Sequence, residues 1–596
     1  MAIALNEDQS SLGQSWQTMW HDKAPPDLVE ACSTADGAAA WKHWQRHLRK
    51  RSKPADLKFL KGKTPPVLWG WPKEWQREAI QLAIETPATL AEIVIGDDGA
   101  SAPDLPLSLQ MIALAHSLPK LAFDLPADTW WFLAERLRTI ATDALAQRIG
   151  AQSDPAEIVR NQLLGGELPL ALGYLFPEIR PHHALRDDAR AALSESMVEL
   201  TDGQGLPDAR LLPVLAPLFA CWTRARLIGR HLKRGAWSRA ADVQFEWLVR
   251  NAIRLADQDG AFLLSSSDPN SGWCKNLFRT ALDLAGDRGD YAAAQIALPK
   301  GIAKKSGKLR SKDLPNPSLN SDWSSITIMS DGWSQRDARL AVSYGNIDPA
   351  IDISVAGDRI FSGAWKAQTT CDGAAVEPVG EWEQLCWEHG KRFDFLELGL
   401  SLTSGLRLER QILFGRADRV LYFADIVFDI ERQPRNLQHS VSFPLANSIL
   451  WRPEAETRDG ILAGVRARAA VMPLALREWR AEPRGGSLSE RESRLTLTQA
   501  ANGRAICCPI FIDLDCKRSG KQRTWRQLTV GDMLEVVPSD IAVGYRIQSG
   551  DDQWLFYRSL GQPGNRTLLG HNIAGEFCAG RFVDGKFKEW IEIEPV

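Results

Sequence analysis

The segment "PKGIAKKSGKLRSKDLPNPSLNS" (residues 299–321) divides the chain into two halves with different hydrophobic patterns. It is basic, contains proline and serine, and shows no apolar periodicity, which is typical of a linker. Before it, apolar residues recur every three or four positions, and after it they alternate with polar residues. This change of period predicts a helical domain over residues 1–298 and a β domain over residues 322–596.

The first half is predicted to be an array of paired helices. Stretches such as "WWFLAERLRTIATDALAQRI" (130–149) and "RAADVQFEWLVRNAIRLA" (239–256) carry apolar side chains at helical spacing. Breaks such as "LTDGQGLPD" (200–208) contain glycine, proline and aspartate, which end helices. Because no strand-like run of convincing length interrupts this half, we expect pairs of helices stacked into an arc or ring.

The second half is predicted to be a large antiparallel β-sandwich. "AIDISVAGDRIFSGAW" (350–365), "RVLYFADIVFDI" (419–430) and "IAVGYRIQSGDDQWLFYRSL" (541–560) alternate apolar and polar residues and contain turn sequences such as "AGD" and "SGDD". Many strands at short spacing without intervening helices indicate antiparallel sheets.

Composition narrows the range of partners. The chain has 596 residues and a formal net charge of −3, so no overall positive field would recruit nucleic acid or an anionic membrane. No segment approaches the roughly 18 uninterrupted apolar residues that a membrane span requires. Trp is unusually frequent, with 23 residues against 6 Tyr, which favours carbohydrate stacking where other features agree and core packing elsewhere.

The cysteines predict a reducing compartment. The nine Cys form no regular framework, and Cys507 and Cys508 are adjacent, so we expect free thiols. The start "MAIALNEDQSSLGQSW" lacks a basic region followed by an apolar one, and no signal peptide is visible. We therefore expect a cytoplasmic protein.

The stretch "RNQLLGGELPLALGYLFPE" (160–178) reads as a helix but contains a Gly-Gly pair and a proline. Departures from local helix rules tend to mark functional positions. Together with "LTDGQGLPDARLLPVL" (200–215) and "LRLERQILFGRADRVLYFADIV" (406–427), this stretch resembles the heparinase II/III-like polysaccharide lyases. Asn161 stands at the Asn of the family's Asn-His pair, Gln162 stands where His is expected, and "GYLFPE" matches the end of the motif.

The resemblance implies an N-terminal (α/α) helical toroid followed by a C-terminal antiparallel β-sandwich. It also implies an acidic poly- or oligosaccharide substrate, cleaved by β-elimination at a uronic acid, and it leaves a periplasmic location open. Such chemistry requires a group that binds the uronate carboxylate, a base, and an acid for the leaving group. The Tyr or Tyr-His expected after the "DG" turn is absent, so the alternative is a catalytically inactive carbohydrate-binding relative.

Several side chains are candidates for these roles, each with a core or surface role as the structural alternative. The candidate catalytic residues are Asn161, Gln162, Tyr174 and His439. The candidate substrate-binding residues are Glu167, Trp222, Arg224, Trp273, Asn276, Trp333, Arg336 and Tyr344. We expect Asn161 and Gln162 to face a cleft and to hydrogen-bond a uronate carboxylate.

Other site chemistry finds less support. The family's sandwich sometimes holds a structural zinc, but His389, His439 and His571 show no short ligand spacing, and adjacent Cys507 and Cys508 on a strand would point to opposite faces. No phosphate-binding glycine loop is present, so we expect no cofactor. Glycoside hydrolysis by a pair drawn from Glu167, Asp202 and Asp208 is a third reading without a motif. The sequence does not predict the oligomeric state.

Overall fold

The computed structural model describes residues 19–34, 37–51, 59–60, 62, 65–72, 104–147, 149–257, 262–264, 274–303, 313–334, 336–482, 485–533 and 535–594. The chain forms two compact units, Met1–Leu314 and Pro315–Val596, which we call the helical unit and the sandwich unit. The unit boundary falls inside the predicted linker, and the first strand occupies its last three residues, so the sandwich begins before residue 322. Residues 304–312 of the linker lie outside the described residues.

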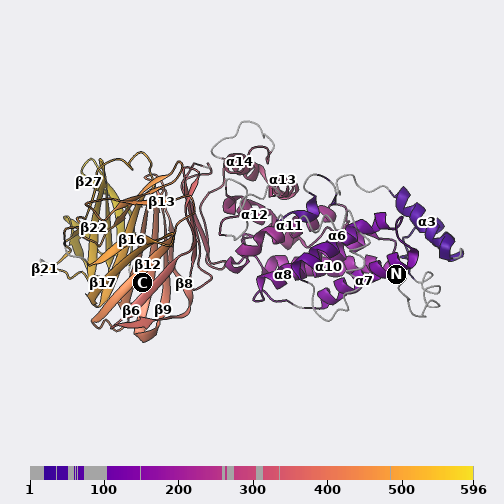
Figure 1. Ribbon diagram of the computed structural model, residues 1–596, viewed down its shortest axis with the longest axis horizontal. Helices are drawn as coiled ribbons and strands as arrows, with labels where there is room; N and C mark the ends of the chain where they lie inside the picture. The colour runs from indigo at the N-terminus through magenta and orange to yellow at the C-terminus, as the bar shows by residue number, and fades with distance from the viewer. Residues whose placement is uncertain are drawn as a thin grey trace. The chain divides into compact units, whose positions relative to one another are not determined.

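The helical unit consists of helices and connecting turns, as the helical periodicity predicts (Figure 1). The α-helices are α2 Pro26–Thr34, α3 Gly37–Lys50, α6 Leu105–Leu121, α7 Ala127–Ala146, α8 Pro155–Asn161, α9 Leu168–Leu175, α10 Arg180–Glu199, α11 Leu215–Gly229, α12 Arg239–Leu255, α13 Cys274–Ala285 and α14 Arg288–Ala297. The other helical turns are η1 Pro66–Leu68, η3 Gln162–Glu167 and η4 Ala209–Val214.

Helix α11 is the core of this unit. With η4 it forms a stretch, Ala209–Gly229, that is long and apolar enough by composition to cross a membrane. However, 83% of the most apolar 18-residue segment of this stretch is buried inside the protein. Such burial is typical of a central helix in a globular array, which is apolar on all sides because other helices surround it.

The sandwich unit is built entirely from antiparallel pairs among its described strands. The central eight-stranded sheet has the order β13-β14-β15-β18-β11-β10-β9-β8. Its strands are β8 Pro378–His389, β9 Phe393–Leu402, β10 Leu406–Gly415, β11 Val420–Asp429, β13 Leu450–Pro453, β14 Gly460–Ala463, β15 Arg468–Pro473 and β18 Ala505–Asp513.

Four smaller sheets surround it. Their orders are β1-β2-β3-β4-β5, β16-β17-β12-β6-β7, β19-β22-β23-β26-β27 and β21-β20-β24-β25. The strands of the first two are β1 Leu319–Ser321, β2 Ile326–Ser330, β3 Arg339–Ser343, β4 Ala350–Val355, β5 Asp358–Ala364, β6 Lys366–Cys371, β7 Ala374–Val376, β12 Arg435–Pro444, β16 Gly486–Arg491 and β17 Arg494–Gly503. Those of the last two are β19 Arg523–Leu528, β20 Gly531–Asp532, β21 Glu535–Val536, β22 Ala542–Ser549, β23 Asp552–Ser559, β24 Arg566–Leu568, β25 His571–Ile573, β26 Phe577–Val583 and β27 Lys586–Ile593.

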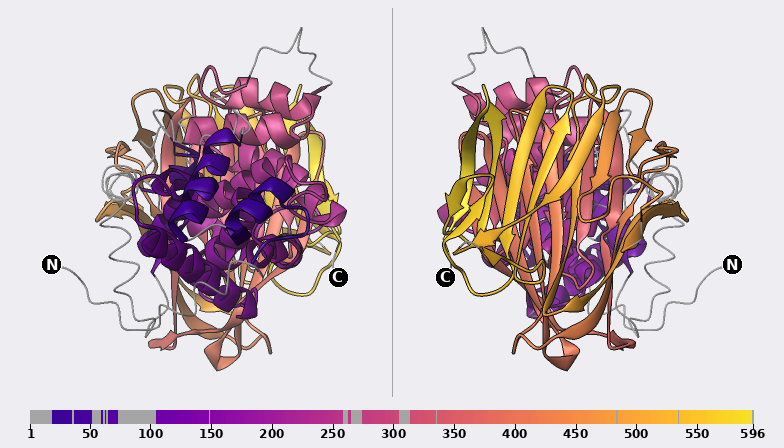
Figure 2. Two further views of the ribbon diagram at one scale, coloured as in Figure 1. Left: turned by 90° about the vertical axis from the view of Figure 1, so that its right-hand side faces the viewer. Right: turned by 90° about the vertical axis from the view of Figure 1, so that its left-hand side faces the viewer.

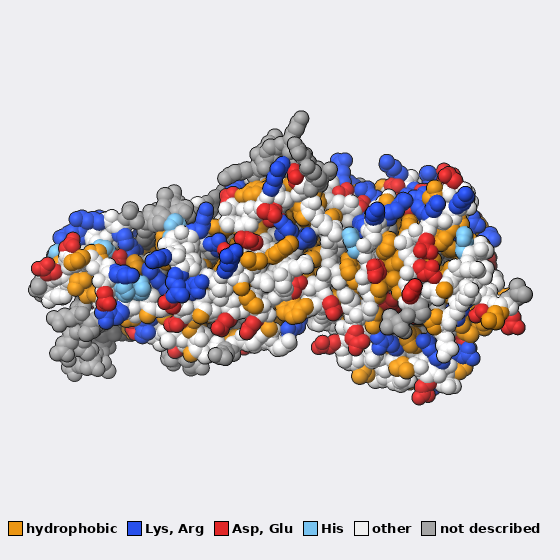
Figure 3. Space-filling model, turned by 180° about the vertical axis from the view of Figure 1, so that it is seen from behind, with side chains coloured by type: hydrophobic (Ala, Val, Ile, Leu, Met, Phe, Trp, Pro, Cys, Tyr) orange, Lys and Arg blue, Asp and Glu red, His pale blue; other side chains and the backbone are white. Residues whose placement is uncertain are grey.

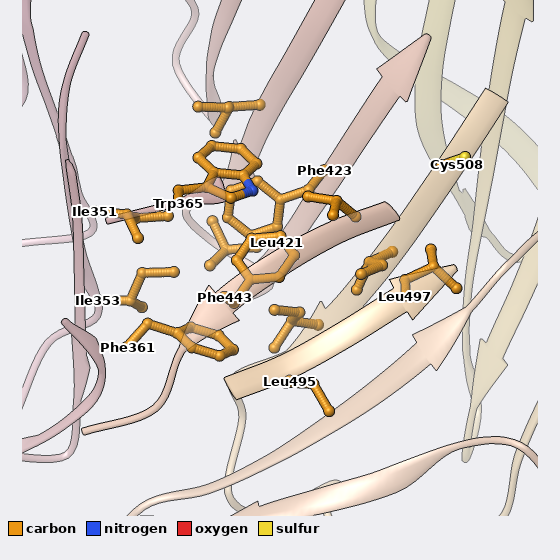
Figure 4. Packing of buried hydrophobic residues seen from close by; sticks show 14 of the residues in the cluster. Ile351, Ile353, Phe361, Trp365, Leu421, Phe423, Phe443, Leu495, Leu497 and Cys508 are labelled. Atoms are coloured by element: carbon orange, nitrogen blue, oxygen red, sulfur yellow. The ribbon is translucent and has the colours of Figure 1, made fainter. Parts of the chain in front are cut away.

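The central sheet is covered on both faces, so the predicted antiparallel sandwich is confirmed and has three layers rather than two. Leu421 and Phe423 of β11 pack into the core shared with β4, β5, β12 and β17 (Figure 4). Tyr422, between them, points to the other core, which is closed by β22, β23 and β26. The right-hand view of Figure 2 shows these C-terminal strands as a layer. Strand β11 therefore alternates between two apolar interiors.

The cysteines agree with this layering. Cys508 belongs to the first core and Cys507 to the second, so the prediction that they point to opposite faces is confirmed. The cysteines whose side chains the structure describes are free thiols. Among the described residues, no group of three or more His, Cys, Asp or Glu side chains is arranged to hold a metal ion.

Candidate functional site

The stretch around residue 160 contains a π-helical turn, η3 Gln162–Glu167, between α8 and α9. All of its residues are buried. A Cβ atom on Gly165 would lie 3.1 Å from the carbonyl oxygen of Ala144, and one on Gly166 would lie 2.6 Å from Cδ2 of Leu193. The two glycines therefore let α7 and α10 pack directly against the turn. A wide turn of this kind inside a helix often occurs at functional sites.

Asn161 and Gln162 make hydrogen bonds within the helical unit. The Asn161 side-chain amide donates to the carbonyl oxygens of Ala144 at 3.1 Å and Gln147 at 3.4 Å, and so satisfies acceptors at the end of α7. The Oε1 of Gln162 accepts a hydrogen bond of 3.0 Å from the indole nitrogen of Trp222. Both side chains thus fix the positions of neighbouring helices.

The same two residues also border a small pocket in the surface of the helical unit. Asn161 and Gln162 line it together with Ser196 and Glu199 of α10. Of the residues that line the pocket, Glu199 is exposed and Gln162 is buried. The expected contact between these amides and a uronate carboxylate stays a prediction.

Glu167 and Arg224 form an ion pair that is fully buried. The guanidinium donates to both carboxylate oxygens of Glu167 at 2.6 and 2.7 Å, and its Nη1 also donates to the carbonyl oxygens of Pro66 and Trp69. The ring of Trp222 is likewise buried. The prediction that Glu167, Trp222 and Arg224 contact substrate is therefore corrected. A sugar would have to break a satisfied buried pair or displace a core ring to reach them.

The remaining candidates of the helical unit differ in accessibility. Tyr174 is half-buried near the end of α9, and its ring centroid lies 6.1 Å from that of His231. Asn276 is half-buried on α13. Trp273 lies outside the described residues. The structure does not bring Tyr174 into the pocket lined by Asn161, so its proposed role as a proton donor stays a prediction.

In the sandwich unit, two predicted sugar platforms are core residues. Trp333 is 5% exposed and its indole nitrogen donates to the carbonyl oxygen of Pro315 at 2.8 Å. Tyr344 is 2% exposed, its hydroxyl donates to Oε1 of Gln384 at 3.1 Å, and burial raises its pKa. The prediction that Trp333 and Tyr344 stack on a sugar is corrected, because stacking needs an exposed ring face. Arg336 is exposed in the turn between β2 and β3.

His439, the predicted base, lies in the core of the sandwich with none of its side chain exposed. One ring nitrogen hydrogen-bonds Oγ1 of Thr369 at 2.9 Å, and the other hydrogen-bonds Oδ2 of Asp425 at 3.0 Å. Arg410 donates to both oxygens of Asp425 at 2.8 Å and stacks on the ring of Trp365. No polymer reaches this imidazole, so the prediction that His439 acts as a base is corrected.

Electrostatics keeps this buried cluster ionised. Burial by itself would raise the pKa of Asp425, but the charge of Arg410 and the hydrogen bonds from Arg410 and His439 outweigh it and hold the pKa well below its ordinary value. The cluster is therefore a paired charge within the core, with the histidine as a hydrogen-bonding partner.

A second histidine, His389, has the accessibility that His439 lacks. It ends β8, across a short turn from Asp394 of β9, and 39% of its side chain is exposed. Its Nδ1 lies 2.5 Å from Oδ1 of the fully buried Asp394, and its Nε2 lies 3.2 Å from the amide nitrogen of Asn316. Asp394 also accepts hydrogen bonds from Ser318 and Arg416. The carboxylate is thus fixed from three sides.

This arrangement fits proton transfer at the surface. Because a carboxylate oxygen only accepts, the contact with Asp394 places the ring proton on Nδ1, and Nε2 then accepts from the amide of Asn316. Nη1 of Arg416 also lies 3.3 Å from Nδ1. The buried carboxylate then orients the ring, and Nε2 is the nitrogen that can accept a proton. The sequence carried a readable signal in "HGKRFD" (389–394), where a turn between two strands sets His389 opposite Asp394.

Comparison with known proteins relates the whole chain to one fold. The sequence matches no family model and no curated protein. The structure is similar to that of the heparan sulfate lyase HepC from Pedobacter heparinus, with a TM-score of 0.58 and 12% identity over 93% of this chain and 100% of that one. It is also similar to heparinase III, with a TM-score of 0.63 and 10% identity over 92% of this chain and 99% of that one. A heparinase III with methylated lysines gives a TM-score of 0.62 at 11% identity, covering 96% and 99% of the two chains. The chain therefore has the heparinase-like polysaccharide lyase fold, a helical toroid followed by an antiparallel β-sandwich.

Proposed function

We propose that the protein is a polysaccharide lyase-like enzyme that cleaves uronic-acid-containing poly- or oligosaccharides by β-elimination. One observation carries the proposal. On a fold shared with heparan sulfate lyases, an exposed imidazole is hydrogen-bonded to a buried carboxylate. His389 and Asp394 together supply an oriented base, which this chemistry requires.

In the proposed step, the substrate displaces the amide of Asn316 from Nε2 of His389, and Nε2 removes the proton from C5 of the uronate. The electrons of the C5–H bond form the C4=C5 double bond, the C4–O bond breaks, and the leaving oxygen takes up a proton from solvent water. Asp394 keeps the ring in a fixed orientation during this transfer. A positioned base of this kind contributes about 10²–10⁴ in rate.

Positive charge beside the base supports the same step. Lys391 and Arg392 are exposed in the turn that follows His389. A cation that pairs with the uronate carboxylate stabilises the negative charge that develops when C5 loses its proton. In the helical unit, Asn161 and Gln162 remain proposed contacts for a carboxylate, because both line a surface pocket. Since the amide of Asn161 already donates to two carbonyl oxygens, a substrate would share it.

A catalytically inactive carbohydrate-binding relative is the second candidate. It is favoured because polar side chains of the motif bond other residues of the protein. Gln162 accepts a hydrogen bond from Trp222, and Glu167 forms an ion pair with Arg224. The lyase would break the C4–O bond of the polymer, whereas the inactive relative would bind the polymer without cleaving it.

The test is the ultraviolet absorbance of an unsaturated uronate, followed during incubation with heparan sulfate, chondroitin sulfate and alginate, with neutral dextran as the control polymer. The proposal expects a rise with at least one uronate polymer and none with dextran. Binding of a uronate polymer without any rise would contradict the lyase proposal and favour the inactive relative.

A further inference from the structure

The face of the helical unit drawn in Figure 3 carries several Lys and Arg side chains, with Asp and Glu side chains between them. One basic run of the helical unit is "RHLKRGAWSR" (230–239), which connects α11 to α12. It holds four Lys or Arg residues and one His without any Asp or Glu, in a chain whose net charge is −3. Arg230, His231, Lys233, Arg234 and Arg239 are exposed.

Neighbouring elements extend this turn into a continuous surface. Arg190 of α10 donates from Nε to the carbonyl oxygen of Arg234 at 3.1 Å. Arg186, one turn earlier, donates to the carbonyl oxygen of Gly173 at 2.8 Å, next to Tyr174. The ring centroid of Tyr174 lies 6.1 Å from that of His231. We call the resulting patch the basic turn surface; it consists of Tyr174, Arg186, Arg190, His231, Lys233 and Arg234.

The turn is held firmly in place. A Cβ atom on Gly229 would lie 2.5 Å from the backbone nitrogen of Ala236, so the two ends of the turn approach as closely as glycine permits. The backbone nitrogen of Ser238 donates to Oγ of Ser194, and the indole of the buried Trp237 donates to Asp242. A fixed surface loses less conformational entropy on binding than a flexible basic tail does.

Its charges are available to a ligand. Asp187 pairs with Arg234 at 2.9 Å, but the two side chains are 71% and 66% exposed. Such exposed pairs contribute about 0–1 kcal/mol and exchange readily for another anion. Cations therefore dominate the basic turn surface.

We propose that the basic turn surface binds the anionic chain of an acidic polysaccharide. The inference rests on the proposed function and extends it, because it places polymer binding on the helical unit in addition to the reacting groups on the sandwich. Single-stranded nucleic acid would use several aromatic platforms, and this surface has one tyrosine and one histidine ring. A membrane surface would use large apolar side chains, and none of the described residues of the turn is an exposed large hydrophobic residue.

The test uses the full-length protein and fluorescein-labelled heparin, followed by fluorescence anisotropy at low and at high salt. The variant Lys233→Gln/Arg234→Gln removes two exposed charges from the surface. The control Lys586→Gln/Lys588→Gln removes two exposed charges from β27. We expect Kd to rise about tenfold in the first variant, which corresponds to about 1.4 kcal/mol, and to stay unchanged in the second, because only the first variant removes cations of the basic turn surface.

An unchanged Kd in the first variant, or an equal rise in both variants, would overturn the proposal. Duplex DNA that binds as tightly as heparin and loses as much affinity would overturn the assignment to a polysaccharide. A uronate tetrasaccharide separates this inference from the lyase proposal, since its elimination should be unaffected by the substitutions. If wild-type protein produced no unsaturated uronate at all, the lyase proposal would fail while the heparin titration still decided the role of the surface.

Discussion

The sandwich unit contains two histidine–aspartate pairs, His439–Asp425 and His389–Asp394, with the same chemical composition. In each pair the aspartate is buried and is also bonded to an arginine, Arg410 or Arg416. The two histidines differ in exposure, which is 0% for His439 and 39% for His389.

This difference in exposure is compatible with a structural role for His439 and with the proposed catalytic role for His389. His439 lies between two sheets, where a proton gained or lost would change a charge that no solvent screens. His389 lies at the end of a hairpin, where Asp394 holds Nδ1, the amide of Asn316 contacts Nε2, and part of the ring is exposed to water. Residue type and pairing alone would rank the two equally, whereas exposure makes only His389 accessible enough to be the proposed base.

The largest expected effect comes from removing the carboxylate of the buried pair. Asp425→Ala leaves the charge of Arg410 uncompensated in the core, so we expect the sandwich unit to lose about 4 kcal/mol of unfolding free energy. Urea denaturation measures this loss. Asp551→Ala, at an exposed turn position, is the matched control and should change stability by less than about 0.5 kcal/mol. Equal stability of the two variants would show that the buried cluster is not a paired charge.

A smaller effect should separate the two histidines. His439→Ala removes hydrogen bonds to Thr369 and Asp425 and leaves a cavity, so we expect a loss of about 3 kcal/mol. His389→Ala removes a partly exposed side chain and should cost less than about 1 kcal/mol. The same urea experiment compares them, and a larger loss for His389→Ala would reverse the roles that burial assigns.

The smallest effect concerns acid stability. The folded-state pKa of Asp425 lies below its unfolded value of 3.8, so the native state favours the ionised carboxylate. Its contribution is therefore fully present above about pH 4 and is lost as the pH falls towards the folded-state pKa. Urea midpoints between pH 6 and pH 3 should fall less steeply in Asp425→Asn than in wild type. Parallel curves would mean that the pKa of Asp425 is not lowered by folding.

Much of the fold follows from local patterns in the sequence. The switch from helical to alternating periodicity near residue 300 predicts both units, and strands such as β11 and β23 fall within the predicted runs. The third layer of the sandwich was not predicted, although "VLYFADIVFD" (420–429) shows little polar interruption because both of its faces are buried.

The site was predicted less completely, because burial depends on how sheets and helices stack. The Gly-Gly pair indicated an irregular helix, but a π-helical turn depends on the close packing of α7 and α10 around Gly165 and Gly166. Glu167 and Arg224 have the chemistry of a substrate site, and only their three-dimensional contact shows that each satisfies the other. His389 and Asp394 could have been paired from "HGKRFD", but their advantage over His439 and Asp425 lies in exposure.

The most direct test of the central claim is the rate of unsaturated-uronate formation by wild type, His389→Ala and His439→Ala, each shown to be folded by circular dichroism. The uronate polymer that gives the largest absorbance rise is the substrate for all three proteins. The account predicts a loss of about 100-fold or more in His389→Ala, because the base is removed. It predicts less than a tenfold change for the folded fraction of His439→Ala. No absorbance rise in wild type, or a wild-type rate in His389→Ala, would contradict it.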